Sequence, residues 1–236
     1  MGIELGICTM TKNQGSRLIE WVKYHNNLGF NKFIIFLDNC NDDSKKILES
    51  ISDIDIDIYE TETFQIDTSG LEWIERSHVL YTFTLSEYEN LDWIGFIEVD
   101  EFIFPQSEDF NLVNFLMSST TNCLYINSWD FKAPFDENKK ILGQSNLVWT
   151  DEQRYNSDYR FRGKSIIKTS EFNKCIDAHH FQQKNGYVSE QFKIPHTDFT
   201  QKNYGNEVII DDSLIRIYHF RNHTPETMNQ YKHIDY

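Results

Sequence analysis

The chain has 236 residues and a formal net charge of −15. A chain of this length can bury a full core, so we expect one domain over residues 1–236. Such acidity, without clustered Lys and Arg, excludes a nucleic-acid partner, because a row of phosphates must be neutralised by basic side chains. No apolar run approaches the ~20 residues of a membrane span, so we expect no transmembrane segment and a cytoplasmic protein.

The first hundred residues alternate strand-like apolar runs with helical spacing. Strands are predicted at residues 3–11, 32–37, 54–59 and 93–104, and helices at residues 18–28, 45–50 and 71–88. This alternation predicts an α/β fold with a mostly parallel, Rossmann-like sheet flanked by helices. In such sheets the ligand binds at the carboxyl ends of the strands, where the polar loops of this chain are expected to gather.

After Pro105 the pattern is looser. A short helix is predicted at residues 109–117, and strands at residues 122–126, 165–168 and 214–218. Residues 131–163 are polar, rich in aromatics and weakly periodic, which indicates loops. We therefore divide the domain into a half with residues 1–104 and a half with residues 105–236.

Three carboxylates interrupt the apolar stretch Trp93–Phe104. On an extended strand, Glu98 and Asp100 leave the same face and Glu101 points the other way. An acid within an apolar run is costly unless it is paired, and two converging carboxylates suit Mg²⁺ or Mn²⁺, which can also hold a diphosphate. The alternative is a solvated strand end with its charges at the tip.

Several motifs of the chain follow one another in a familiar order. They are Cys8-Thr9-Met10-Thr11-Lys12-Asn13, the stretch Leu18–His25, the stretch Leu28–Phe33, Asp38-Asn39 with Asp43, Trp93–Phe102, Lys164–Lys168, His179-His180 and Tyr218-His219-Phe220. In this order they resemble glycosyltransferase family 92 and the related family-2-like glycosyltransferases. The resemblance implies a GT-A fold and transfer of a sugar from a nucleotide-diphosphate donor, normally with inversion and a divalent metal.

Two positions depart from the family pattern. The family's Asp-x-Asp followed by Glu-Phe appears here as Glu98-Val99-Asp100-Glu101-Phe102, so a longer carboxylate replaces the first Asp. The family's Trp followed by Phe-Gly is approximated by Trp129-Asp130-Phe131-Lys132. The resemblance makes residues 1–104 the donor half and residues 105–236 the acceptor half.

The resemblance also suggests which residues form the site. The expected ligands of Mn²⁺ or Mg²⁺ are Asp100, Glu98 and His219, with His179 and His180 as further histidine candidates. The expected donor-binding residues are Thr9, Lys12, Asn13, Asp38, Arg76 and Glu98. Asp38 would accept a hydrogen bond from the base and Arg76 would reach the diphosphate. The alternatives are an Asx turn and helix cap for Asp38, Asn39 and Asp43, and a surface ion pair for Arg76.

Inversion by direct displacement needs a carboxylate base on the acceptor hydroxyl. The candidates are Asp130, Glu152 and Glu190. Asp130 ranks first because it follows the strand predicted at residues 122–126, whose end should open near the donor. Trp129 beside it offers an aromatic face to an acceptor sugar.

We expect a UDP-sugar donor, with a GDP-sugar as second option, and a glycan or glycolipid acceptor in polysaccharide biosynthesis, at the cytoplasmic membrane face if the acceptor is a lipid. The first alternative is a sugar-phosphate nucleotidyltransferase, although residues 9–16 hold a single Gly and a single Lys instead of a Gly-rich basic loop. The second is a catalytically inactive sugar-binding domain, in which Glu98 marks the loss of a metal site. A metal-dependent nuclease is disfavoured by the acidity.

Overall fold

The computed structural model describes residues 2–119, 122–132, 142, 148–149, 163–175, 181–183, 207–209 and 214–220. The helices in these ranges are α1 (Gly15–Asn27), α2 (Ser44–Glu49), α3 (Trp73–Glu87) and α4 (Leu112–Ser118), with a 3₁₀ turn at Thr169–Glu171. The strands are β1 (Leu5–Thr11), β2 (Lys32–Leu37), β3 (Asp55–Glu60), β4 (Trp93–Phe96), β5 (Glu101–Pro105), β6 (Cys123–Lys132), β7 (Val148–Trp149), β8 (Gly163–Lys168), β9 (Phe172–Cys175), β10 (Phe181–Gln183), β11 (Glu207–Ile209) and β12 (Ile215–Phe220). No helix in the described ranges is long and apolar enough to cross a membrane.

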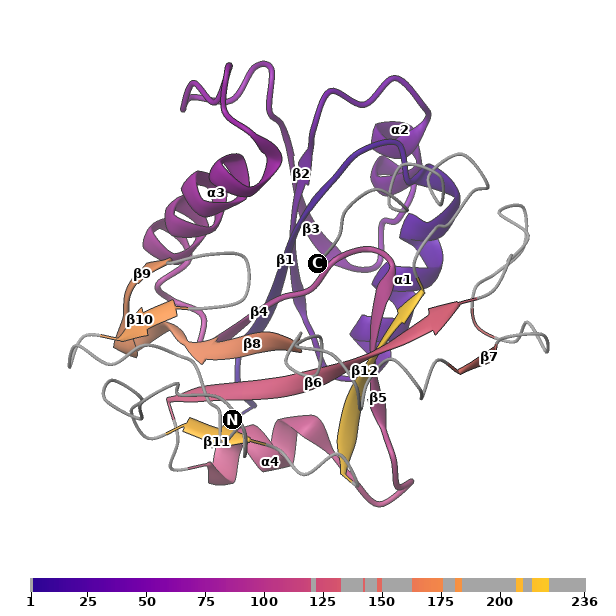
Figure 1. Ribbon diagram of the computed structural model, residues 1–236, viewed down its shortest axis with the longest axis vertical. Coiled ribbons are helices and arrows are strands. Elements are labelled where there is room, and N and C mark those ends of the chain that lie inside the picture. Colours follow the sequence, from indigo (N-terminus) through magenta and orange to yellow (C-terminus); the bar gives the residue numbers. More distant parts are fainter. Residues whose placement is uncertain are drawn as a thin grey trace, which may run out of the picture.

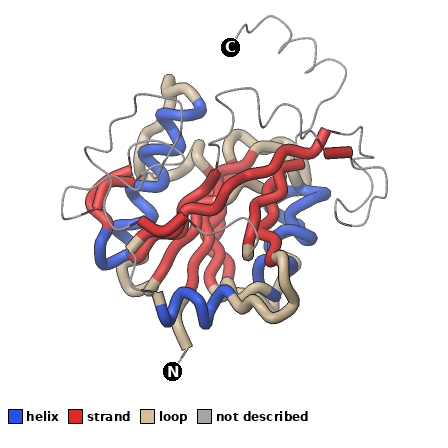
Figure 2. The backbone as a smooth tube through the Cα atoms, turned by 60° about the horizontal axis from the view of Figure 1, so that its bottom comes forward, coloured by secondary structure: helices blue, strands red, loops and turns tan. Residues whose placement is uncertain are grey.

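One large sheet joins both halves of the chain. Its strand order is β3-β2-β1-β4-β8-β6-β12-β5, while β7 and β11 also pair with β6. The first four of these strands are mutually parallel, and β8 is antiparallel to both of its neighbours. Figure 2 shows the strands gathered in the centre with helices around them. The predicted α/β class with a mostly parallel sheet is confirmed.

Helices cover both faces of the parallel strands (Figure 1). α1 and α2 lie on one side and α3 lies on the other, which gives two core layers. Because side chains alternate along a strand, β1 serves both layers. Its Ile7 belongs to the layer of Trp21 from α1, whereas the Cys8 thiol lies 3.5 Å from the Thr84 hydroxyl of α3.

The predicted single strand over residues 93–104 is wrong. β4 ends at Phe96, and a turn closed by a 2.9 Å hydrogen bond from the Glu101 N–H to the Glu98 carbonyl separates it from β5. β5 then leaves β4 and pairs antiparallel with β12 at the far edge of the sheet. A run of apolar residues cannot reveal such a break, because both segments are buried strands.

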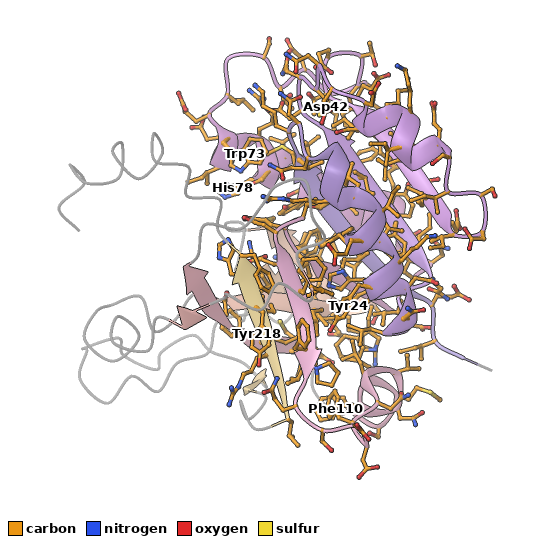
Figure 3. All side chains as sticks on the ribbon, turned by 90° about the vertical axis from the view of Figure 1, so that its right-hand side faces the viewer. Tyr24, Asp42, Trp73, His78, Phe110 and Tyr218 are labelled. Carbon is orange, nitrogen blue, oxygen red and sulfur yellow. The ribbon has the colours of Figure 1, made fainter. Side chains whose placement is uncertain are left out.

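The aromatic face of α1 fixes the new direction of β5. The Trp21 indole donates to the Glu101 carbonyl at 3.1 Å, and the Tyr24 hydroxyl donates to the Ile103 carbonyl at 2.8 Å. The Tyr24 ring also lies 5.2 Å from the Phe104 ring, which stacks at 4.6 Å on Tyr218 of β12. Figure 3 labels Tyr24 and Tyr218 on this face. α1 therefore holds β5 against β12.

His25 is a buried part of the same contact. Its Nδ1 lies 2.9 Å from the Trp21 carbonyl, and its Nε2 lies 3.4 Å from the Ile103 N–H. These partners require a proton on Nδ1 and a lone pair on Nε2, which is a neutral ring. Burial lowers the pKa of His25 to about 3, against the opposing effect of its bond to the Trp21 carbonyl.

We expect His25→Gln to reduce the acid sensitivity of folding. In the unfolded chain His25 takes up a proton below about pH 6.5, whereas in the folded protein its ring stays neutral. The free energy of unfolding therefore falls as the pH drops from that value toward the folded pKa. The upper limit of this loss is about 1.4 kcal/mol per pH unit. Urea unfolding at a series of pH values should show a shallower dependence for the variant, with His78→Gln in α3 as control. If the unfolding free energy depends on pH equally in the variant and the parent, His25 is not the buried neutral group described above.

Candidate functional site

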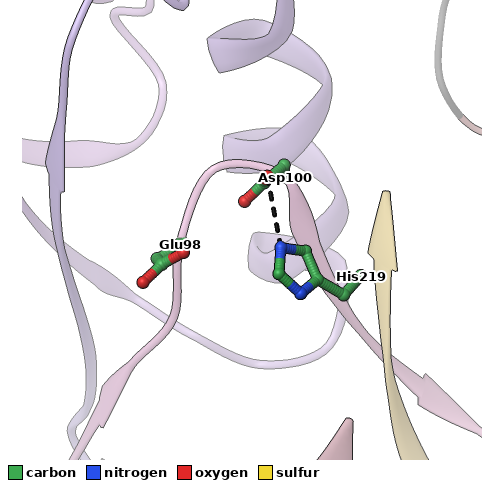
Figure 4. A group of neighbouring side chains, drawn as sticks. All are labelled: Glu98, Asp100 and His219. Atoms are coloured by element: carbon green, nitrogen blue, oxygen red, sulfur yellow. Dashed lines mark ion pairs between the residues drawn. The ribbon is translucent and has the colours of Figure 1, made fainter. Parts of the chain in front are cut away.

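Glu98, Asp100 and His219 meet at the turn between β4 and β5. Each offers one ligand atom, and these atoms lie within 4.8 Å of one another. His219 Nε2 lies 3.3 Å from Asp100 Oδ2 (Figure 4). The pairing of β12 with β5 delivers the histidine, because His219 stands opposite Glu101 and the Phe220 N–H donates to the Asp100 carbonyl at 2.8 Å.

The donor set of this cluster fits a divalent ion. Two carboxylates and one imidazole give oxygen and nitrogen ligands, which Mn²⁺ accepts readily and Mg²⁺ accepts less well. All three residues are partly exposed, so an ion could reach them from solution. The convergence of Glu98 and Asp100 comes from the turn and not from the alternation of one strand.

Two buried ionisable side chains, Lys164 and Glu101, lie against the cluster. Lys164 of β8 places its Nζ 2.9 Å from Glu98 Oε1 and 3.5 Å from Glu101 Oε2. The other Glu101 oxygen lies 3.9 Å from His219 Nδ1, and Glu101 Oε2 accepts the Glu98 N–H at 2.9 Å. The prediction that Glu101 points away from Glu98 and Asp100 is therefore wrong, because the turn folds its side chain back under them.

The titration of this pair follows from burial and charge. Burial raises the pKa of the Glu101 carboxyl to about 7, although the Lys164 ammonium acts to lower it. Burial alone would lower the pKa of Lys164, but the carboxylates of Glu101 and Glu98 raise it above its ordinary value. The lysine therefore stays charged. Lys164 lies outside the residues that the sequence predicts for the site, although it begins the motif Lys164–Lys168 that carries part of the family resemblance.

The loops after β1 and β2 are bonded to each other. Asn13, with φ of +53°, accepts the Asn41 N–H on its side-chain oxygen at 2.9 Å. Asp42 accepts the Gly15 N–H at the start of α1 at 3.0 Å and the Ser44 N–H at the start of α2 at 3.1 Å. The alternative in which Asp43 caps the helix is wrong, because Asp43 makes no side-chain cap and Asp42 serves instead.

Asp38 and Arg76, both expected at the donor, contact each other. Asp38 directly follows β2 and has a buried carboxylate, whose Oδ1 pairs with Arg76 Nη1 and accepts the Thr61 hydroxyl at 3.1 Å. Arg76 also donates to the Leu71 carbonyl at 2.9 Å. The alternative of an ion pair for Arg76 is thus realised, but with a buried partner. Its Nε has no hydrogen-bond partner among the described residues.

The other predicted donor residues differ in exposure. Thr9 lies within β1 with a fully buried side chain, and its hydroxyl has no partner in the described part of the chain. Lys12 and Asn13 are exposed in the loop that follows β1. A direct role of Thr9 at the donor, which stays a prediction, would require the site to open toward it.

The predicted acceptor residues fall mostly outside the described ranges. Glu152, Glu190, His179 and His180 are among the residues that the structure does not describe. Trp129 and Asp130 lie inside β6 and not after it, because β12 and β7 extend the ladder beyond the last contact with β8 at Asn127. The backbone register sets Asp130 beside His219, while its side chain lies outside the description.

We expect Arg76→Met to destabilise the protein. Removing one partner of a buried ion pair leaves the other charge uncompensated, at a cost of about 3 kcal/mol. The exposed pair of Lys46 and Asp43 supplies the matched control, since Lys46→Met should leave the unfolding free energy unchanged within error. Chemical denaturation measures both. If Arg76→Met lowers the unfolding free energy no more than Lys46→Met does, the buried Asp38 carboxylate does not depend on Arg76 for its stabilisation.

Comparison with known proteins gives a consistent match. The sequence profile of glycosyltransferase family 92 matches residues 3–235. A family 92 protein of Ricinus communis is 28% identical over 193 residues, and one of Arabidopsis thaliana is 29% identical over 195 residues; each match covers 78% of this chain. The chain spans about a third of the length of these relatives, with 32% of each covered.

Solved structures are more distant. One of them is glucosyl-3-phosphoglycerate synthase from Mycobacterium tuberculosis in complex with Mn²⁺, UDP and phosphoglyceric acid. It is 11% identical, with a TM-score of 0.41, over 72% of this chain and 57% of that one. A likeness at this level is too weak to assign a ligand or a role.

Proposed function

The chain belongs to glycosyltransferase family 92, and we propose that it moves a sugar from a nucleotide-diphosphate donor to a glycan or glycolipid hydroxyl, with inversion. The observation that supports this most is the cluster of Glu98, Asp100 and His219 at the sheet edge. A binding site at the carboxyl ends of parallel strands is the expected place for such a donor.

The metal would be held by Asp100 and His219, with Glu98 sharing its carboxylate between the ion and Lys164. When bound, Mn²⁺ or Mg²⁺ supplies positive charge beside the leaving diphosphate. Asp100 is anchored for this task through its backbone carbonyl, which accepts the Phe220 N–H at 2.8 Å. His219 is anchored by the ladder of β12 with β5 and β6. Both proposed ligands are thus held by backbone hydrogen bonds to β12 or within its ladder.

The donor nucleotide would lie over the loops after β1 and β2. Lys12 and Asn13 are exposed there, and Asp38 is held in place by Arg76 and Thr61. Because Arg76 already neutralises Asp38, we propose that the pair acts as one unit that orients the nucleotide. We favour UDP over GDP as the nucleotide of the donor. Thr9 remains a proposed contact of the donor nucleotide.

The acceptor hydroxyl needs a base, for which we propose Asp130 ahead of Glu152 and Glu190. The support is the backbone register that sets Asp130 beside His219, close in the sheet to the proposed metal ligands. Trp129, its neighbour in β6, is the proposed stacking surface for an acceptor sugar.

The first test is thermal stabilisation by UDP, GDP, CDP and TDP, each with and without Mn²⁺. A ligand at 100-fold over its Kd should add about 2.7 kcal/mol of stability. We expect one nucleotide to stabilise the protein only when the metal is present, and Asp100→Ala to abolish the effect. Asp53→Ala, in the turn before β3, is the control for loss of an acidic side chain elsewhere. No stabilisation under any condition would favour an inactive sugar-binding domain.

Neutralising the base should slow the transfer and spare donor binding. Asp130→Asn is expected to lower kcat by about 10²–10⁴-fold, the usual contribution of a general base. The affinity for the nucleotide with Mn²⁺ should stay unchanged, because the base contacts only the acceptor. Glu152→Gln and Glu190→Gln are measured in parallel in the same sugar-transfer assay. If one of these two variants loses most of its kcat while Asp130→Asn stays fully active, that residue is the general base.

A further inference from the structure

Lys164 is a cation built into the sheet beneath the proposed metal ligands. It lies in β8 opposite Ile126 of β6, with its side chain only 2% exposed. Its Nζ contacts Glu98 Oε1 at 2.9 Å and Glu101 Oε2 at 3.5 Å. A fully buried lysine is rare in a protein core, and here two carboxylates hold it in place.

The carboxylate of Glu98 therefore faces two cations. It contributes a ligand atom to the cluster with Asp100 and His219, and one of its oxygens already accepts a hydrogen bond from Lys164. An incoming divalent ion must share Glu98 with the ammonium. The two cations also repel each other strongly, because the ammonium is buried and little screened by water.

A diphosphate changes this balance. Glu98 and Asp100 bring two carboxylates to the turn, Glu101 adds a buried carboxyl group, and the Lys164 ammonium contacts both Glu98 and Glu101. Without the lysine, the carboxylates of Glu98 and Asp100 would attract a divalent ion strongly in the absence of any nucleotide. With it, the ion and the ammonium together form a site of concentrated positive charge, which a nucleoside diphosphate would stabilise.

We propose that Lys164 couples the two binding events: it weakens the binding of the divalent ion alone and strengthens the binding of the ion together with a nucleoside diphosphate. This inference rests on the proposed function of the site. Lys164 is a positioning residue in this scheme, since it acts through Glu98 and Glu101. Its effect should appear in binding measurements without any turnover.

The test is calorimetric titration of the wild-type protein and of Lys164→Met. The titrants are Mn²⁺ alone, and then UDP or GDP with and without Mn²⁺. We expect the variant to bind Mn²⁺ alone about tenfold more tightly, and the gain in nucleotide affinity caused by Mn²⁺ to fall about tenfold or more. Lys168→Met, four residues along the same strand, removes the same charge away from the cluster and should leave both quantities unchanged.

Two further variants separate coupling from folding. Lys164→Arg keeps the charge and should preserve most of the coupling. The double variant Glu101→Gln with Lys164→Met removes the buried ammonium together with the buried carboxyl group that contacts it, so it should fold even if the single variant does not. Its coupling should still be lost.

Weaker binding of Mn²⁺ alone to Lys164→Met, or unchanged coupling in the double variant, would overturn the inference and leave Lys164 a structural residue. If neither UDP nor GDP binds the wild-type protein with Mn²⁺, the proposed function fails and this inference fails with it. If either nucleotide binds with the metal but the variants keep the coupling, only the role of Lys164 is wrong.

Discussion

The buried ammonium of Lys164 makes the turn after β4 possible. Three carboxylates follow one another within four residues there, and one of them, Glu101, has a side chain only 3% exposed. Such a buried acid would cost several kcal/mol if it were left uncompensated. Lys164 and the Glu98 N–H together stabilise it. The carboxylates can therefore stay close together at the sheet edge, which is what a metal site requires.

The position of Lys164 depends in turn on an antiparallel insertion in the sheet. β8 lies between β4 and β6, and runs against both. This placement brings Lys164, from the later half of the chain, into contact with Glu98. The same later half supplies His219 through β12, which pairs with β5 and β6. The two halves of the chain thus meet in the cluster itself.

Rigid support comes from α1. Its residues Trp21, Tyr24 and His25 make three hydrogen bonds with the backbone of β5 at Glu101 and Ile103. The rings of Trp21, Tyr24 and Phe102 surround His25. Fixed dipoles suit a site for a highly charged ligand. Protein groups that must reorient when the ligand binds stabilise its charge less well than groups already held in position.

The periodicity of the sequence was enough to predict the strands and helices of residues 3–96, because the spacing of apolar residues within each segment reflects which of its faces is buried. Glu98 and Asp100 were recognisable for a similar reason, since acids in an apolar run demand an explanation. Only the tertiary structure decided that this run breaks at Phe96, that Glu101 turns inward, and that Asp38 pairs with Arg76. Lys164 is separated from Glu98 by 66 residues, so its pairing depends on the strand order and leaves no local pattern. The pairing partner of a strand is a non-local property. That is the physical reason why the acids Glu98 and Asp100 stood out in the sequence, whereas the buried lysine beside them did not.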